Sequence, residues 1–97
     1  MKTELNYDRL SIDTTPIKVR LTSDIYIVFT KRGAYAPAID LLDLKTLIQH
    51  SLYVGAASIA KRFETLRMEN GGKIEGLEVW VERAGSGKFD GYTVDLA

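Results

Sequence analysis

Apolar and polar residues alternate strictly near the C-terminus, and this pattern constrains the fold more than any other feature of the chain. Leu77, Val79 and Val81 alternate with Trp80 and charged residues, and a second alternating stretch follows a glycine-containing turn over residues 84–87. Successive side chains of a strand point to opposite faces, so the pattern predicts an antiparallel hairpin with one buried face. The register that buries the apolar set pairs Val81 with Tyr92, Val79 with Val94, Leu77 with Leu96 and Arg83 with Asp90.

A second hairpin is predicted in the N-terminal half. Residues 17–21 alternate, and residues 25–29 are all strong strand formers. A three-residue loop between them would place the apolar side chains of both strands on one face. A helix that begins at Thr22 and ends at Gly33 is the competing interpretation. The first 15 residues alternate loosely and predict an irregular strand.

The middle of the chain predicts two helices. Residues 38–52 are rich in apolar side chains at helical spacing, which favours a largely buried helix. After Gly55, residues 56–69 predict an amphipathic helix that Asn70-Gly71-Gly72 ends. The expected fold class is therefore α+β: a single domain over residues 1–97, in which an antiparallel sheet of an N-terminal and a C-terminal hairpin packs against two central helices.

Composition narrows the classes of function. The 97 residues hold 13 Lys and Arg against 13 Asp and Glu, which disfavours a strongly basic nucleic-acid binder but leaves room for a local patch. With no cysteine and one histidine, we expect no disulfide, metal site or cofactor. The chain has no apolar run of about 20 residues and no apolar segment after Met1 of the kind a signal peptide carries, so we expect a cytoplasmic protein without a membrane span.

Candidate catalytic residues are few. His50 has no neighbouring partner in the sequence that would make it a general base. Asp40 and Asp43, three residues apart, are interpreted as carboxylates of the first turn of a helix. Gly85-Ser86-Gly87-Lys88 lacks the further positions of a phosphate-binding loop and lies between strands. The sequence thus predicts a protein that is not an enzyme.

One resemblance suggests DNA binding. Residues 58–67 resemble the recognition helix of winged-helix domains, and residues 91–96 resemble a closing wing strand. The likeness covers residues 40–96 at most, and residues 25–29 would have to supply the missing first helix. It implies a DNA-binding transcriptional regulator that uses Lys61, Arg62 and Arg67.

The outward positions of the predicted C-terminal hairpin suggest a different interaction. An exposed aromatic side chain there is surrounded by carboxylates, and no Lys or Arg is expected on the same face. Such a surface suits a basic protein partner. The competing interpretation is an ordinary solvated sheet face with the Trp packed under another segment. The predicted partner-binding residues are Glu75, Glu78, Trp80, Glu82 and Asp95.

In size, compactness and the face of residues 78–82, the whole chain resembles the small phage-encoded anti-CRISPR inhibitors, the type I-F group among them. The resemblance implies a viral, non-enzymatic inhibitor in the host cytoplasm. Its partner would be a CRISPR surveillance complex, with carboxylates in the groove meant for target DNA. The chain departs from a full DNA mimic in its formal net charge of zero.

Overall fold

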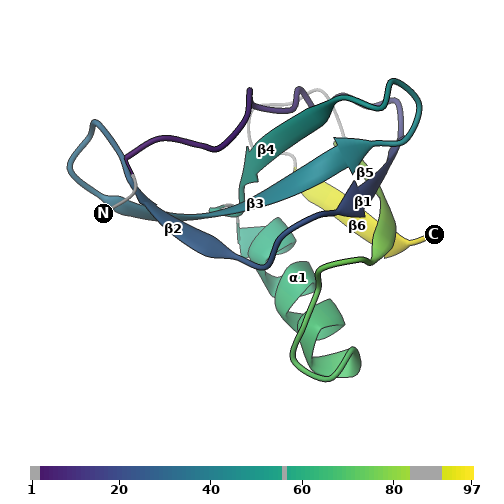
Figure 1. The fold of residues 1–97 in the computed structure, drawn as a ribbon. Coiled ribbons are helices and arrows are strands. Elements are labelled where there is room, and N and C mark those ends of the chain that lie inside the picture. The colour runs from purple at the N-terminus through teal and green to yellow at the C-terminus, as the bar shows by residue number, and fades with distance from the viewer. Residues whose placement is uncertain (1–2, 56, 84–90) are drawn as a thin grey trace.

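A computed structural model describes residues 3–55, 57–83 and 91–97 (Figure 1). The element order is β-β-β-β-α-β-β. The elements are β1 (Ile17–Leu21), β2 (Tyr26–Phe29), β3 (Tyr35–Asp43), β4 (Gln49–Tyr53), α1 (Ala57–Glu69), β5 (Glu78–Arg83) and β6 (Tyr92–Leu96).

Strand β3 organises the sheet, whose order is β2-β3-β1-β5-β6 with β4 paired to β3 off this path. All pairs are antiparallel. β4 pairs with residues 38–42 of β3, β1 with residues 41–43 and β2 with residues 35–38. A strand has only two edges, so β1 and β2 must lie one after the other along the edge that β4 leaves open.

The predicted hairpin between residues 17–21 and 25–29 is therefore wrong, although both segments are strands. The residues between them form a bulge instead of a turn. The Thr22 amide donates to the Asp40 carbonyl at 2.9 Å, and the Asp40 amide donates to Ser23 Oγ at 2.9 Å. The chain thus continues along β3 without reversing. The competing helix from Thr22 to Gly33 is also absent.

The predicted helix over residues 38–52 is wrong as well, because this segment forms most of the β3–β4 hairpin. Ala38, Ile39, Asp40 and Leu41 are all buried, since β3 is covered on both faces. A strand covered on both faces loses the period of two that distinguishes it from a helix. The fold-class prediction of two central helices is corrected accordingly: the described residues form a mostly antiparallel sheet with a single helix. A winged-helix arrangement, which needs more helices, is not the one observed.

Helix α1 agrees with its prediction. Its apolar face buries Ile59, Phe63 and Leu66. The helix ends where the glycines permit left-handed backbone: Gly71 has φ +70°, and the Gly72 amide donates to the Arg67 carbonyl at 2.8 Å. Ala56, which was expected on the same face, lies outside the described residues.

The C-terminal hairpin forms with a different register from the predicted one. Val81 pairs with Val94 and Val79 with Leu96, a shift of two residues along β6. An even shift leaves each side chain on its original face, so Val79, Val81 and Val94 are buried as expected, but Leu96 at the end of β6 is 51% exposed. The predicted turn at residues 84–87 and the partner proposed for Arg83, Asp90, lie outside the described residues.

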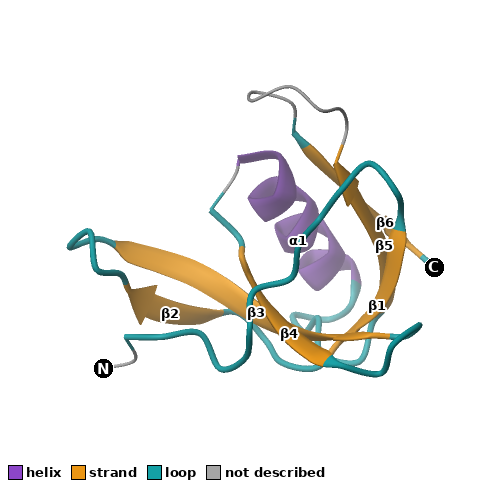
Figure 2. Ribbon diagram, turned by 90° about the horizontal axis from the view of Figure 1, so that it is seen from above, coloured by secondary structure: helices purple, strands orange, loops and turns teal. Residues whose placement is uncertain are grey.

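The sheet curves around α1, which lies on its concave side (Figure 2). The core joins α1 to the inward side chains of the strands and to Leu10 and Ile74. The N-terminal segment runs from β4 to β5. It makes one parallel bridge, between Arg9 and Ser51, and then reaches β5, where the Arg83 amide donates to the Asp13 carbonyl at 2.7 Å. Instead of the irregular strand predicted for the first 15 residues, the described part of this segment is an extended chain with one bridge to β4.

A substitution in the β3–β4 turn can test whether residues 38–52 form a hairpin or the predicted helix. Leu47 has φ +60° and is 71% exposed. Glycine adopts this backbone without the steric cost of about 1 kcal/mol that a side chain incurs. We expect Leu47→Gly to leave the free energy of unfolding unchanged or raise it by up to about 1 kcal/mol. In a helix, the same change would lower it by about 1 kcal/mol. Urea denaturation measures the difference, and a clear loss would contradict the turn.

Candidate functional site

The outward side chains of β1, β5 and β6 form the surface that the sequence singled out, here called the Trp80 face. Its central position is Trp80, which pairs with Lys18 on one side and Asp95 on the other. The indole is 43% exposed, so the outward orientation expected from the alternation is the one observed. The Trp80 face comprises Lys18, Arg20, Glu78, Trp80, Glu82, Thr93 and Asp95.

The expectation that no cation shares this face is wrong. β5 has β1 as its second neighbour, and β1 places Lys18 beside Trp80 and Arg20 beside Glu78. The Lys18 Nζ atom lies 6.0 Å from the centre of the indole ring, within the range of a cation–π contact. Arg20 donates through Nε and a terminal nitrogen to Glu78 Oε2, at 3.1 and 2.7 Å. The hydrogen bond from Arg20 lowers the pKa of Glu78 below its usual value.

The other predicted acids are less constrained. Asp95 lies 4.0 Å from Arg62, at the limit of an ion pair, and is exposed. Glu82 is half-buried, and Glu75 is exposed just before the strand. Among the described residues, neither Glu75 nor Glu82 forms an ion pair. The face therefore carries three carboxylates against two cations, and its charge is mixed.

The cations proposed for DNA binding lie on α1. Arg62 donates from Nε to the Val94 carbonyl at 2.7 Å, which ties the helix to β6. Arg67 donates two hydrogen bonds to Glu64, which lower the pKa of Glu64 and raise that of Arg67. Lys61 is exposed. Two of the three cations are thus engaged within the chain.

A buried polar cluster on the convex side of the sheet was not anticipated. The Asp40 carboxylate is 6% exposed and accepts hydrogen bonds from Tyr26 Oη at 2.5 Å, Ser51 Oγ at 2.7 Å and Asn6 Nδ2 at 2.7 Å. The Tyr7 amide donates to Ser51 Oγ at 3.0 Å. Burial and the hydrogen bond to Asp40 raise the pKa of Tyr26. The cluster fastens the N-terminal segment to β3 and β4.

The interpretation of Asp40 and Asp43 as helix first-turn carboxylates is corrected by these positions. Asp43 ends β3, and its Oδ1 accepts from the Lys45 amide at 2.9 Å in the β3–β4 turn. His50 lies on β4 rather than on a helix, and its Nδ1 is 3.2 Å from the Asp8 carbonyl. The sequence did contain a signal for this cluster, because Asp40 lies within the apolar run of residues 38–42. A carboxylate buried in such a run requires several hydrogen-bond donors.

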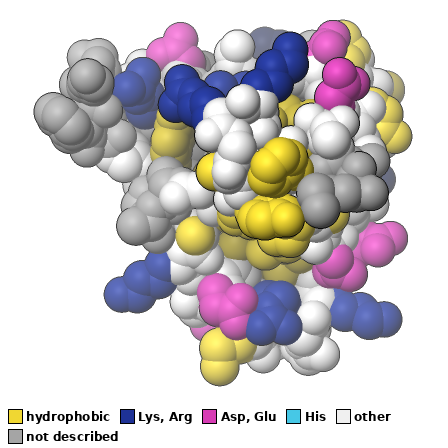
Figure 3. All heavy atoms as spheres, turned by 90° about the vertical axis from the view of Figure 1, so that its left-hand side faces the viewer, with side chains coloured by type: hydrophobic (Ala, Val, Ile, Leu, Met, Phe, Trp, Pro, Cys, Tyr) yellow, Lys and Arg dark blue, Asp and Glu magenta, His cyan; other side chains and the backbone are white. Residues whose placement is uncertain are grey.

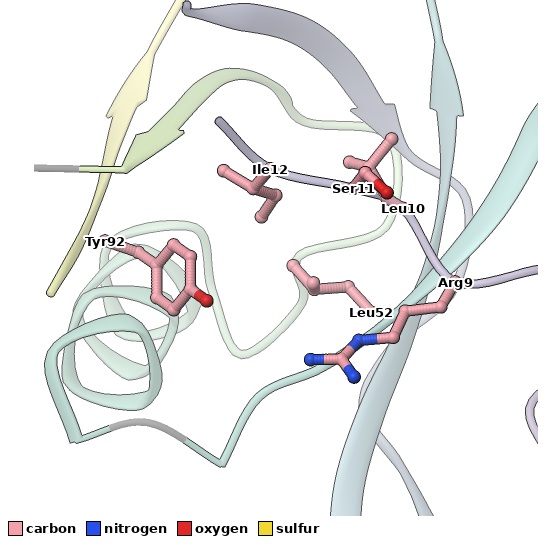
Figure 4. A pocket seen from close by; sticks show the side chains of 6 residues that line it. All are labelled: Arg9, Leu10, Ser11, Ile12, Leu52 and Tyr92. Atoms are coloured by element: carbon pink, nitrogen blue, oxygen red, sulfur yellow. The ribbon is translucent and has the colours of Figure 1, made fainter. Parts of the chain in front are cut away.

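A hollow opens between the N-terminal segment and β6 (Figure 4). Its cavity volume is about 300 Å³, near the lower limit for small-molecule sites. The Arg9 guanidinium lies at one side and the Tyr92 hydroxyl at the other, with Leu52 and Ile12 pointing between them. The lining residues are Arg9, Leu10, Ser11, Ile12, Leu52 and Tyr92.

Comparisons with family models, curated proteins and solved structures found no match to this chain. The described part of the chain holds one helix, whose 13 residues are too few to span a membrane.

The Arg20–Glu78 pair predicts a pH dependence. A carboxyl whose folded pKa is lowered stabilises the fold above its unfolded pKa, and this contribution disappears as pH falls through the folded pKa. In Arg20→Gln, the pKa of Glu78 should rise toward its usual value, measured by NMR titration of the side-chain carboxyl carbon. The difference in stability between wild type and variant should shrink as pH falls from neutral through the titration of Glu78. Lys45→Gln is the control and should leave the Glu78 titration unchanged.

The Asp40 cluster predicts an effect on the N-terminal segment. Tyr26→Phe removes one hydrogen bond to a carboxylate and should lower the free energy of unfolding by about 1–2 kcal/mol. It should also speed hydrogen exchange at the Tyr7 and Leu10 amides, which bond to Ser51. Tyr35→Phe, whose side chain is 63% exposed, is the matched control. Equal stability and equal exchange in the two variants would show that the cluster does not fasten the segment.

Proposed function

We propose that this chain is a non-enzymatic protein-binding domain that docks its partner through the Trp80 face. The exposed indole at the centre of three paired strands carries the proposal. Trp is the residue type most enriched at binding hot spots, because one side chain buries a large area with few rotatable bonds. The paired backbone of β1, β5 and β6 holds that side chain in place, so little conformational entropy is lost on docking.

The charges around Trp80 bear on the kind of partner. Three carboxylates and two cations leave the face close to neutral, so it would not attract a basic groove by charge alone. The affinity would come from burying Trp80, and the charges would select the orientation of the partner. Asp95 on β6 and Lys18 on β1 lie on opposite sides of Trp80, and Glu82 follows it on β5, an arrangement that suits a partner surface that also carries both signs.

The resemblance to anti-CRISPR inhibitors gives this proposal its most specific form. In that form the chain covers a site on a nucleic-acid-handling complex such as a CRISPR surveillance complex, and its docking keeps target DNA away. Arg20 forms an ion pair with Glu78 and neutralises its charge. In this proposal Trp80, rather than the acids, therefore makes the main contact with the partner. The mechanism would be steric exclusion rather than imitation of DNA.

Two features support a non-enzymatic function. The buried Asp40 carboxylate accepts hydrogen bonds from three donors of the chain itself. The Nδ1 atom of His50 lies 3.2 Å from the Asp8 carbonyl, so a backbone group is the partner of that nitrogen. The winged-helix alternative is disfavoured, because the described residues form a sheet with one helix and because Arg62 and Arg67 bond within the chain.

Trp80→Ala tests the proposal. With a purified type I-F surveillance complex, we expect the wild-type chain to bind and to reduce capture of target DNA. Trp80→Ala should weaken binding by about 30-fold or more, the effect of losing a hot spot of about 2 kcal/mol. Tyr35→Ala is the control for loss of an exposed aromatic ring elsewhere. Equal loss in both variants would contradict docking through the Trp80 face.

If that complex does not bind, the broader proposal is tested without it. A photo-crosslinking residue at Thr93, an exposed position of the Trp80 face, should capture a protein from host cells, and the same residue at Met68 on α1 should not. Glu78→Lys with Glu82→Lys should reduce the capture by reversing the charge beside Trp80. Lys61→Glu should leave it unchanged. Capture that is insensitive to Trp80→Ala would overturn the assignment of this face.

A further inference from the structure

Three hollows are lined in part by the N-terminal segment. The first is the cavity that contains Arg9 and Tyr92, described above. Arg9 also lines the second, which has a volume of about 580 Å³ and lies over Tyr53 and the β2–β3 turn. Lys31 lines both the second hollow and a third one of about 280 Å³ at the tip of that turn. Neighbouring hollows share lining residues, Arg9 between the first two and Lys31 between the last two, and the three hollows together are here called the basic track.

Cations and aromatic rings alternate along the basic track. Each hollow has one aromatic side chain in its wall: Tyr92 in the first, Tyr53 in the second and Phe29 in the third. Arg9 lies at the first junction and Lys31 at the second, with Arg32 beside the middle hollow. The Arg9 guanidinium is 5.8 Å from the centre of the Tyr53 ring, so a cation and an aromatic face are already held together.

The cations of the track are available to a ligand. Arg9, Lys31 and Arg32 are exposed, and within the described ranges none of them forms an ion pair. Glu4 is the one acidic residue in the described lining. The end of the molecule that carries the β2–β3 turn shows Lys and Arg side chains along its upper part, with Asp and Glu side chains beside them and a hydrophobic patch below (Figure 3). In the described lining of the second and third hollows, three exposed cations stand against one carboxylate.

We propose that the basic track binds single-stranded nucleic acid. Phosphates would contact Arg9, Lys31 and Arg32, and bases would stack on the rings between them, beginning with Tyr53. Single strands suit the track because their bases are free to stack on side chains, whereas the bases of a duplex are stacked on one another. The track shares no residue with the Trp80 face, so this inference does not rest on the proposed protein partner.

Fluorescence anisotropy with a labelled oligothymidylate of about 12 nucleotides tests the inference. We expect saturable binding at about 50 mM salt, and a decrease of log K with log salt of slope about −2, as three phosphate contacts to a single strand give. Lys31→Ala with Arg32→Ala should reduce that slope by about 1.4 and weaken binding at least about tenfold. The fluorescence of Trp80 should not change on binding.

Matched variants distinguish binding at the basic track from nonspecific electrostatic attraction to the whole surface. Lys45→Ala with Lys73→Ala removes the same charge from exposed positions outside the track and should retain wild-type binding. Tyr53→Phe keeps the ring and should bind normally, while Tyr53→Leu should lose about tenfold. Circular dichroism shows whether each variant folds. The inference is overturned by no anisotropy change up to about 100 µM protein, by equal losses in the two charge variants, or by equally tight binding of a duplex of the same length.

Discussion

The burial of β3 on both of its faces is the constraint on which the rest of the structure depends. On the concave side, Ile39 and Leu41 join the core under α1. On the convex side, Ala38 and Asp40 are covered as well. Both edges of the strand are also paired, by β4 on one side and by β1 and β2 on the other. A strand enclosed in this way holds four other segments in fixed positions, including the N-terminal segment.

Asp40 shows how a charge is accommodated at the centre of this arrangement. A carboxylate there would be costly without partners, and it receives hydrogen bonds from Tyr26 on β2, Ser51 on β4 and Asn6 in the N-terminal segment. The three donors come from three parts of the chain, so the carboxylate is satisfied only when all three are assembled. The same contacts hold in place the N-terminal segment that forms one wall of the basic track.

The two proposed surfaces use the sheet differently. The Trp80 face is the outward surface of three paired strands, where charges partly cancel and one large aromatic side chain is exposed. The basic track is a set of hollows beside the N-terminal segment, where cations lie without ion-pair partners among the described residues. An outward face with a central Trp suits another protein, and hollows with alternating cations and rings suit a strand of nucleic acid. A protein with both surfaces could hold a partner and a strand at once.

Local features of the fold follow from residues that are close together in the chain: the alternation that points Val79 and Val81 inward and Trp80 outward, and the face and end of α1. These features depend on side-chain direction and on glycine conformation within a few residues, so they can be predicted from the sequence. Which strands pair depends instead on contacts between segments that are far apart in the chain. Backbone hydrogen bonds are the same for every sequence, so nothing local to residues 17–21 shows that β1 lies beside β5 and brings Arg20 to Glu78. Equally, nothing local to residues 38–41 distinguishes a strand buried on both faces from a buried helix, because covering the second face removes the alternation that marks a strand.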